Sequence, residues 1–425
     1  MMHFDSLQGW LSWQESLHPL AIDLGLERAA HIYRALNPDA IKPPTITVAG
    51  TNGKGSCVAF LEAIYTAAGY RVGSYTSPHI QKYNERIKIN GVPVSDALIC
   101  EAFARIEAVR KDISLSYFEF GTLAALDIFW RSDVDIQLLE VGMGGRLDAV
   151  NIIDADVALV SSIHIDHVDW LGTTRETIGY EKAGIFRKNT PAIIGDLDPP
   201  DALRQSAIDK QALLYCMGKD FTYQKQQSSW DWSAGEQSLT QLPEPGLKGE
   251  HQYRNASSVI MAVQQLNSRV LVTETAIRSG LKNVSLPGRF QRIDLADNTP
   301  LLLDVGHNPE AVTTLTDHLN AAYPNRRVHA VFSMMKDKDI ASVLKIMAPA
   351  IHAWYFVPLT NPRAISTVAV QEFFSQCQIA NVSFDYTAFA GAFAAAKKQC
   401  RKNDLLLVFG SFFLVSDCLN ELEGK

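Results

Sequence analysis

A glycine-rich segment carries the residue types that grip a phosphate group, and it reads Gly50-Thr51-Asn52-Gly53-Lys54-Gly55-Ser56. Glycines let backbone N–H groups curl around a phosphate, and a following helix adds partial positive charge at its N-terminus. Lys54 can reach the outer phosphates of a nucleotide, and Ser56 can offer its hydroxyl to the phosphates or to magnesium. The match to G-x-x-x-x-G-K-[ST] is imperfect, because Val48 replaces the first glycine and Gly55 follows the lysine. The pattern favours nucleotide binding over a plain turn with a solvated lysine.

Oxygen and nitrogen ligands follow two later apolar runs and could hold the magnesium that nucleotide chemistry needs. Glu140 lies near the end of the run 136–141, and Asp166 and His167 follow the run 157–163. Magnesium prefers oxygen ligands and keeps several waters. From the residues alone, Glu140 could equally be a solvated glutamate, while His167 and Lys182 would more often be ordinary surface or structural residues.

The elements that must position these residues alternate between strand and helix patterns. A β-branched run at 45–49 precedes the glycine segment, and helical periodicity follows from Ser56 to Ala68. The runs 136–141 and 157–163 each end in a glycine-rich or charged cluster. Buried strands with such ends predict a parallel α/β sheet, in which ligands bind outside the carboxyl ends of the strands.

The second half of the chain changes character twice. Residues 224–249 are rich in Gln, Ser, Trp and Pro and predict short antiparallel strands or loops, with a helix from about His251. A new series of strands is expected at 300–304, 328–332, 353–357 and 405–409. We therefore predict an α/β chain: a P-loop parallel-sheet ATPase domain over 1–292, and a smaller Rossmann-like α/β domain over 293–425.

Composition bounds the partners and the compartment. The chain has 425 residues, 47% hydrophobic and 20% charged, with a formal net charge of -7, which argues against nucleic acid or an anionic membrane as partner. The six cysteines form no C-x-x-C pair, so reduced thiols are expected. The first residues lack the features of a secretory signal, and the apolar run 405–415 is too short to cross a bilayer. We expect a cytoplasmic protein with an amphipathic N-terminal surface helix.

Short motifs occur in a consistent order from Asp23 to Pro309, and a weaker match continues beyond them. They are Asp23-Leu24-Gly25-Leu26-Glu27-Arg28, the segment Gly50 to Ser56, Thr76-Ser77-Pro78-His79, Phe118-Glu119-Phe120-Gly121, Leu139 to Ala149, Asp166-His167, Glu181-Lys182-Ala183-Gly184, Pro287-Gly288-Arg289-Phe290 and Asp304-Val305-Gly306-His307-Asn308-Pro309. Each alone is weak, but the set is specific. Together they resemble the bacterial bifunctional dihydrofolate synthase/folylpolyglutamate synthase family, a relative of the Mur peptide ligases.

The resemblance implies roles in ATP and metal binding. Ser77 and Glu140 would hold the magnesium nearest the nucleotide. Glu140 and His167 would share a second magnesium with Lys182, whose side-chain nitrogen would be carbamylated. Lys54, Glu140, His167 and Lys182 would be the catalytic set. The implied ATP contacts are Thr51, Asn52, Gly53, Lys54, Gly55, Ser56, Asn255, Arg289, Asp304 and His307.

The resemblance also implies a pterin pocket. The segment Asp23 to Arg28 resembles the loop that covers a pterin, although its spacing alone favours a helix cap with an exposed Arg28. The implied folate contacts are Asp23, Leu24, Gly25, Leu26, Arg28, Phe118, Phe120, Gly121, Arg146, Leu147 and Asp148. The chain departs from the family at Gly306, where alanine is common, and at Phe413, where a polar residue is common.

The implied reaction is ATP-dependent addition of L-glutamate to dihydropteroate, and to the glutamate tail of reduced folates, through an acyl phosphate. ATP and two Mg²⁺ would be the cofactors, and the chain would be a monomer with small-molecule partners only. Folylpolyglutamate synthase activity alone is one alternative. A Mur-type ligase is another, although the residues before Gly50 are too few for a uridine-nucleotide domain. A P-loop ATPase that ligates nothing is a third. No residue is assigned as the base for the amine.

Overall fold

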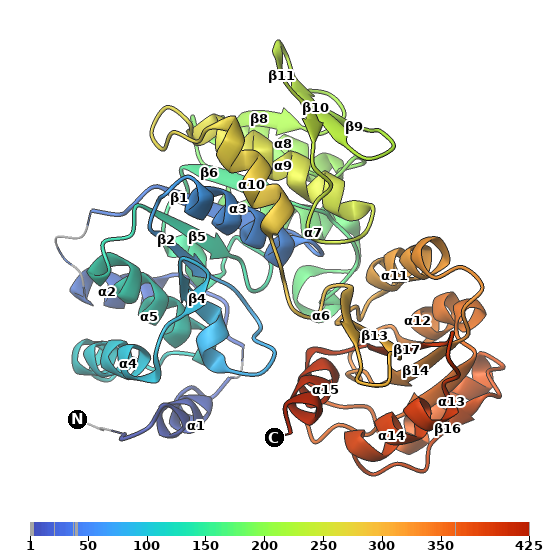
Figure 1. Ribbon diagram of the computed structural model, residues 1–425. Coiled ribbons are helices and arrows are strands. Elements are labelled where there is room, and N and C mark those ends of the chain that lie inside the picture. Colours follow the sequence, from blue (N-terminus) through green and yellow to red (C-terminus); the bar gives the residue numbers. More distant parts are fainter. Residues whose placement is uncertain (1–3, 21, 37, 39–40, 362, 425) are drawn as a thin grey trace. The chain divides into compact units, whose positions relative to one another are not determined.

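The computed structural model describes residues 4–20, 22–36, 38, 41–361 and 363–424 (Figure 1). The chain divides into two compact units. The N-terminal unit comprises Met1–Gly246 and Gln252–Val284, and the C-terminal unit comprises Leu247–His251 and Ser285–Lys425. The last change of unit along the chain falls at Val284–Ser285, shortly before the boundary expected between 292 and 293. The functions assigned to the two domains stay predictions.

An eight-stranded sheet forms the frame of the N-terminal unit, in the order β4-β3-β2-β5-β1-β6-β7-β8. All neighbours from β2 to β8 in that order pair in parallel, and β3 and β4 add an antiparallel edge. This confirms the predicted parallel sheet. The strands are β1 (Thr45–Ala49), β2 (Val72–Tyr75), β3 (Ile87–Ile89), β4 (Val92–Pro93), β5 (Ile136–Glu140), β6 (Val157–Val160), β7 (Pro191–Ile194) and β8 (Leu213–Cys216).

The central strands of this sheet bring the candidate site residues to one edge. β1 is buried along its whole length, as expected for a parallel strand with both faces covered. Val48 of β1 pairs with Glu140 of β5, and Ala49 pairs with Val160 of β6. The glycine segment, Glu140 and the residues after β6 therefore leave the sheet side by side.

Helices and short 3₁₀ turns precede, connect and follow these strands (Figure 1). Their bounds are α1 (Leu7–Leu17), α2 (Glu27–Leu36), α3 (Lys54–Ala67), α4 (Asp96–Arg110), α5 (Tyr117–Arg131), α6 (Val168–Leu171), α7 (Arg175–Lys182), α8 (Asp201–Asp209), α9 (His251–Leu266), α10 (Glu274–Asn283), η1 (Tyr83–Arg86), η2 (Ala149–Ile152) and η3 (Ala183–Ile185). The segment with altered composition forms an antiparallel sheet of β9 (Thr222–Lys225), β10 (Trp230–Ala234) and β11 (Gln237–Leu242), as predicted.

The C-terminal unit is a second α/β domain around a six-stranded sheet of order β12-β13-β17-β14-β15-β16. β12 is antiparallel to β13, and the remaining neighbours are parallel. The predicted smaller α/β domain is thus confirmed. Its elements are β12 (Gln291–Asp294), β13 (Pro300–Asp304), α11 (Pro309–Ala322), β14 (Val328–Phe332), α12 (Ile340–Met347), η4 (Ala348–Ala350), β15 (Ala353–Phe356), α13 (Thr367–Gln376), β16 (Val382–Ser383), α14 (Phe389–Gln399), β17 (Leu405–Phe409) and α15 (Phe412–Glu423).

Two general expectations can be compared with the structure. Each of the six cysteines is a free thiol. Among the helices that the structure describes, none combines the length and the apolar character needed to cross a membrane.

Candidate functional site

The glycine segment between β1 and α3 has a backbone that only glycine tolerates at two positions. Gly50 has a φ of +144° and Gly53 a φ of +88°. A Cβ atom on Gly50 would lie 1.9 Å from the Ser161 hydroxyl oxygen, and one on Gly53 would lie 2.7 Å from the Asn255 amide oxygen. Glycine is therefore required here both by conformation and by space. Helix α3 begins at Lys54, so its N-terminus points out of this turn.

The residues that follow β6 hold the glycine segment in place. Thr51 donates its N–H to the Ser162 carbonyl at 2.7 Å. The Thr51 hydroxyl donates to the His164 carbonyl and accepts the His164 N–H, both at 3.0 Å. The Ser161 hydroxyl donates to the Asn52 carbonyl at 2.6 Å. We did not predict roles for Ser161 and Ser162, because nothing in their local sequence marks them.

Helix α9 supports the same segment from a distant part of the chain. The Gln252 amide donates to the Ser56 hydroxyl at 3.3 Å and accepts from the Asn255 side chain at 3.0 Å. Ser56 is 3% exposed. Asn255, predicted as an ATP contact, thus lies directly against Gly53.

Two lysines converge on one backbone carbonyl at the glycine segment. Lys54 and Lys182 donate to the Gly50 carbonyl at 3.0 Å and 2.8 Å. Lys182 is buried, and this burial, followed by the charge of Lys54, lowers the pKa of its ammonium to about 7, although Asp166 and Asp148 oppose the shift. An amine with this pKa is largely neutral slightly above pH 7 and can act as a nucleophile.

Glu140 and Ser77 form the part of the site that suits magnesium. Glu140 ends β5 and is 5% exposed. Its Oε2 atom accepts the Ser77 backbone N–H at 3.2 Å, so the residue that carries the Ser77 hydroxyl lies next to this carboxylate. These are hard oxygen ligands, and magnesium is commonly held by one or two carboxylates plus substrate phosphates. Over the described residues there is no group of three or more His, Cys, Asp or Glu that could hold a metal without such help.

His167 lies outside the buried part of the site. It is exposed, has a φ of +54° and precedes α6. Its backbone N–H donates to the Asp166 carboxylate at 2.8 Å. Because β1 and β6 are parallel neighbours, the loop that carries His167 leaves the same edge of the sheet as the glycine segment. The role of His167 as a metal ligand stays a prediction.

The segment Asp23 to Arg28 is bound to the start of α5. The Asp23 carboxylate contacts the Arg28 guanidinium at 2.6 Å and the His18 ring at 2.9 Å. Arg28 also donates to the Asp23 carbonyl at 3.0 Å and to Glu119 at 3.2 Å. Glu119 is buried and accepts the Ser116 N–H that opens α5. Arg28 is therefore a paired side chain rather than an exposed cap residue, and Leu24, Gly25 and Leu26 form a half-buried loop between these anchors.

The two phenylalanines predicted as folate contacts point in different directions. Phe118 is partly exposed and packs on Gly142, where a Cβ atom would lie 2.5 Å from its ring. Phe120 is fully buried and contacts the rings of Trp13 and Phe103 in the core. Residues two positions apart on a helix lie on opposite sides. Phe118 therefore fits a pocket wall, whereas the structure places Phe120 in the core.

Gly121 is the third predicted contact on α5. A Cβ atom there would lie 2.6 Å from the Tyr83 hydroxyl and 3.1 Å from the Tyr75 hydroxyl. The glycine thus allows two tyrosine hydroxyls to approach the helix closely.

Asp148 is a buried carboxylate near the glycine segment. It accepts the Met143 N–H at 2.8 Å and the Val150 N–H at 3.1 Å. Burial raises its pKa to about 6, although these backbone bonds and the charge of Lys54 act in the opposite direction. Arg146 is exposed and pairs with Glu181 at 2.9 Å. Leu147, which lies between Arg146 and Asp148 in the chain, is half-buried. Of this stretch, Asp148 is the residue nearest in character to a ligand-binding group.

The C-terminal unit gathers its own predicted ATP residues around the end of β13. Asp304 accepts the N–H groups of Phe290 and Gly306 at 3.1 and 2.7 Å, and burial raises its pKa while Arg289 opposes the shift. The Arg289 guanidinium lies 5.5 Å from the ring centre of Phe412, and the His307 ring lies 6.2 Å from it. We did not predict Phe412. The next residue, Phe413, is 52% exposed.

Comparison with known proteins gives an independent result. Residues 48–263 match the Mur ligase middle domain, and residues 288–412 match the Mur ligase glutamate ligase domain. The dihydrofolate synthase/folylpolyglutamate synthase of Escherichia coli K12 is 42% identical over 419 residues, which span 99% of this chain and 96% of that protein. The chain belongs to this family. The Bacillus subtilis enzyme of the same name is 31% identical over 99% of this chain and all of its own length.

Solved structures of the family share the whole fold. The FolC protein of Escherichia coli in complex with DHPP and ADP has a TM-score of 0.93 and 40% identity, with 100% of this chain and 99% of that chain covered. The bifunctional enzyme of Yersinia pestis complexed with AMPPNP and Mn ion has a TM-score of 0.91 at 40% identity, with both chains covered completely. The chain is therefore an enzyme, a ligase of the Mur ligase superfamily.

Proposed function

We propose that this enzyme joins L-glutamate to dihydropteroate, forming dihydrofolate, and to the glutamate tail of reduced folates, while ATP is converted to ADP and phosphate. One observation carries the proposal: in a chain of this family, the glycine turn, two lysines and Glu140 meet at one edge of the parallel sheet. Relatives support the substrates, since one was solved with DHPP and ADP and another with Mn, AMPPNP and L-glutamate.

The chemistry explains why a nucleotide is needed. A carboxylate does not react with an amine at neutral pH, because oxide would have to leave. Transfer of the γ-phosphoryl group of ATP to a carboxylate oxygen gives an acyl phosphate and ADP. The neutral amine of glutamate then attacks the acyl carbon, the C–O bond to phosphate breaks, and the amine loses a proton to a base that we do not assign.

The protein's task in this reaction is to neutralise charge and to position two anions. The N–H groups of the glycine turn and the Lys54 ammonium would bind the ATP phosphates. Ser77 and Glu140 would hold one magnesium, and Glu140, His167 and Lys182 would hold a second. Bound there, magnesium supplies positive charge that offsets repulsion between the phosphates and the substrate carboxylate.

The second magnesium site would use a carbamylated Lys182, and the surroundings of this lysine suit that modification. A neutral amine can add to carbon dioxide and lose a proton, which converts a cationic side chain into a carboxylate-like ligand. The lowered pKa of Lys182, about 7, provides the neutral amine near physiological pH. Burial would protect the carbamate from hydrolysis.

The pterin would bind beside the phosphate site. Asp148 is close enough to Lys54 for the ammonium to act on its pKa, so an acid-bearing ring near Asp148 could present its carboxylate to the phosphates. Phe118 offers an aromatic wall, and the Asp23–Arg28 pair anchors the covering loop. Of the C-terminal unit, Arg289, Asp304 and His307 would contact the nucleotide.

We also propose that the enzyme works as a monomer in the cytoplasm and has no nucleic-acid partner, in line with its net charge of -7.

Release of ADP tests the proposal directly. We expect the enzyme to form ADP with dihydropteroate and with tetrahydrofolate, in each case only when glutamate is present. A Mur precursor serves as the control substrate and should not be consumed. Activity with tetrahydrofolate alone would restrict the enzyme to folylpolyglutamate synthesis, and ADP release without glutamate or pteroate would identify a plain ATPase.

A further inference from the structure

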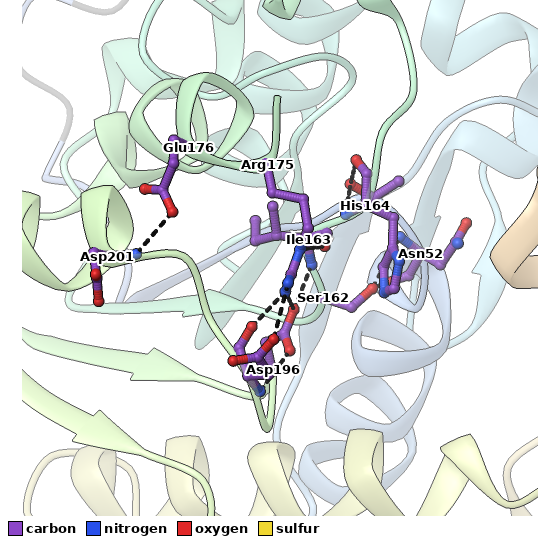
Figure 2. A network of polar contacts seen from close by, with 10 residues as sticks. Asn52, Ser162, Ile163, His164, Arg175, Glu176, Asp196 and Asp201 are labelled. Atoms are coloured by element: carbon purple, nitrogen blue, oxygen red, sulfur yellow. Dashed lines mark hydrogen bonds and ion pairs between the residues drawn. The ribbon is translucent and has the colours of Figure 1, made fainter. Parts of the chain in front are cut away.

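The segment that holds the glycine turn runs past the end of its strand. Strand β6 ends at Val160, whose carbonyl accepts the N–H of Gly195, the residue that follows the neighbouring strand β7. Beyond this point the polar backbone groups of Ile163 are bound by two side chains. Asp196 accepts its N–H at 2.8 Å, and Arg175 donates its Nε–H to its carbonyl at 2.9 Å (Figure 2).

Arg175 and Asp196 are themselves paired and anchored. The Arg175 guanidinium lies 3.4 Å from the Asp196 carboxylate and 3.0 Å from the Asp198 carboxylate, and it also donates to the Asp198 carbonyl. Asp196 accepts the Asp198 N–H at 3.0 Å. Only 7% of the Asp196 side chain is exposed. The two residues, which we call the Ile163 clamp, therefore replace the missing strand neighbour.

The clamp and the glycine turn hold opposite sides of one short segment. Thr51 bonds to the Ser162 carbonyl and to both backbone polar groups of His164, which flank Ile163. Backbone polar groups of an extended segment alternate in direction, so the flanking residues face the turn while Ile163 faces the clamp. Any shift of Ile163 must therefore move both partners of Thr51.

We propose that Arg175 and Asp196 are positioning residues that set the place of the phosphate-binding turn through Ile163. They act on nucleotide binding through the backbone of Ser162 and His164, and the role rests on the proposed function of the turn. Small displacements of a positioned group can lower activity by about a hundredfold. Loss of the clamp should therefore weaken ATP binding without changing the chemistry of the turn itself.

Glu176 offers a matched control on the same helix. It follows Arg175, yet its carboxylate accepts the Asp201 N–H at 3.2 Å (Figure 2). It also accepts the Ala202 N–H at 2.7 Å, so Glu176 caps α8. Its loss would loosen α7 from α8 but would leave Ile163 held. Glu176→Gln therefore separates a general loss of stability from a displaced turn.

The test compares Arg175→Met, Arg175→Lys and Glu176→Gln for KM of ATP, kcat, the dissociation constant of MgATP by calorimetry, and thermal unfolding. Arg175→Met should raise the KM and the dissociation constant about tenfold, and Arg175→Lys less, because an ammonium lacks the planar fork of donors. Glu176→Gln should change neither constant appreciably, whatever its effect on the unfolding temperature. Unchanged ATP constants in both Arg175 variants would overturn the proposal.

A double-mutant cycle adds a readout that a structural role would not move. If Arg175 acts through Thr51, the effect of Thr51→Val on MgATP binding should largely disappear in Arg175→Met, whereas it should persist in Glu176→Gln. Independent, multiplicative effects of Arg175→Met and Thr51→Val would contradict the clamp. Calorimetry keeps the two hypotheses apart: a wild-type enzyme that binds MgATP but needs no glutamate refutes the proposed function and still tests the clamp.

Discussion

Replacing Lys182 by methionine should stabilise the ligand-free protein while it removes activity. Burial lowers the pKa of Lys182 from 10.5 to about 7, so between these values the unfolded chain binds a proton that the folded protein does not. Burial of Lys182 therefore lowers the free energy of unfolding. This effect is fully present below pH 7 and disappears as the pH rises through 10.5. At pH 8 it amounts to about 3 kcal/mol.

Methionine would remove this contribution together with one hydrogen bond. The Gly50 carbonyl would lose the Lys182 donor at 2.8 Å but keep Lys54 at 3.0 Å, so the lost bond should cost only about 1 kcal/mol. The net gain of about 2 kcal/mol corresponds to a rise of about 2–3 °C in Tm for a protein of this size. Turnover should fall at least about a hundredfold, as for other groups that stabilise developing charge.

The assay pairs thermal unfolding in carbon-dioxide-free buffer from pH 7 to 10.5 with glutamate-dependent ADP release. Lys210 supplies a matched control, since burial lowers its pKa to about 8 and its ammonium donates to the Ala183 carbonyl at 2.7 Å. Lys210→Met should keep its activity. A Lys182→Met protein that is less stable throughout this pH range, or that turns over normally, would refute the reasoning.

Other predictions concern the phosphate and pterin sites. Lys54→Ala should abolish glutamate-dependent ADP release with an unchanged circular dichroism spectrum, and near-normal turnover would remove the phosphate-binding assignment. Gly53→Ala should raise the KM for ATP, because left-handed backbone costs about 1–2 kcal/mol and the new methyl group would lie 2.7 Å from Asn255; an unchanged KM would contradict this. Burial raises the pKa of Asp148 from 3.8 to about 6, so the folded protein binds this proton more tightly than the unfolded chain does. The resulting contribution to the free energy of unfolding is fully present below pH 3.8 and is lost as the pH rises through 6. The KM for dihydropteroate should fall over the same rise if the ionised carboxylate binds the pterin, and Asp148→Asn should show neither pH dependence. Lys182→Ala should regain some turnover with added short carboxylates if the lysine is carbamylated, and full unrescued activity would exclude that.

The sequence predicted strands well where apolar runs are bounded by polar residues. The expected strands at 45–49, 300–304 and 405–409 coincide with β1, β13 and β17. The predicted run 157–163 extends beyond β6, which ends at Val160. After Ser161 and Ser162, the backbone of Ile163 is bound by the side chains of Arg175 and Asp196 in place of a neighbouring strand. Hydrophobic periodicity cannot distinguish a ladder partner from a side chain.

The candidate site divides in a similar way. The glycine turn could be located because its residues are contiguous and each has a local physical role. The clamp, the Arg28–Glu119 pair and the serines behind the turn join residues far apart along the chain, which a single sequence does not reveal. Helical spacing could have shown that Phe118 and Phe120 face opposite sides, but only the structure shows that the Phe120 side is the buried one. The low pKa of Lys182 likewise arises only from its place in the fold.

The fate of a labelled oxygen tests the central claim most directly. If the glycine turn presents the γ-phosphoryl group of ATP to the pteroate carboxylate, dihydropteroate labelled with ¹⁸O in that carboxylate must pass one ¹⁸O atom to inorganic phosphate in each turnover. Mass spectrometry of the phosphate should show this single label, and only when glutamate and ATP are both present. Unlabelled phosphate from a reaction that forms dihydrofolate would contradict the account.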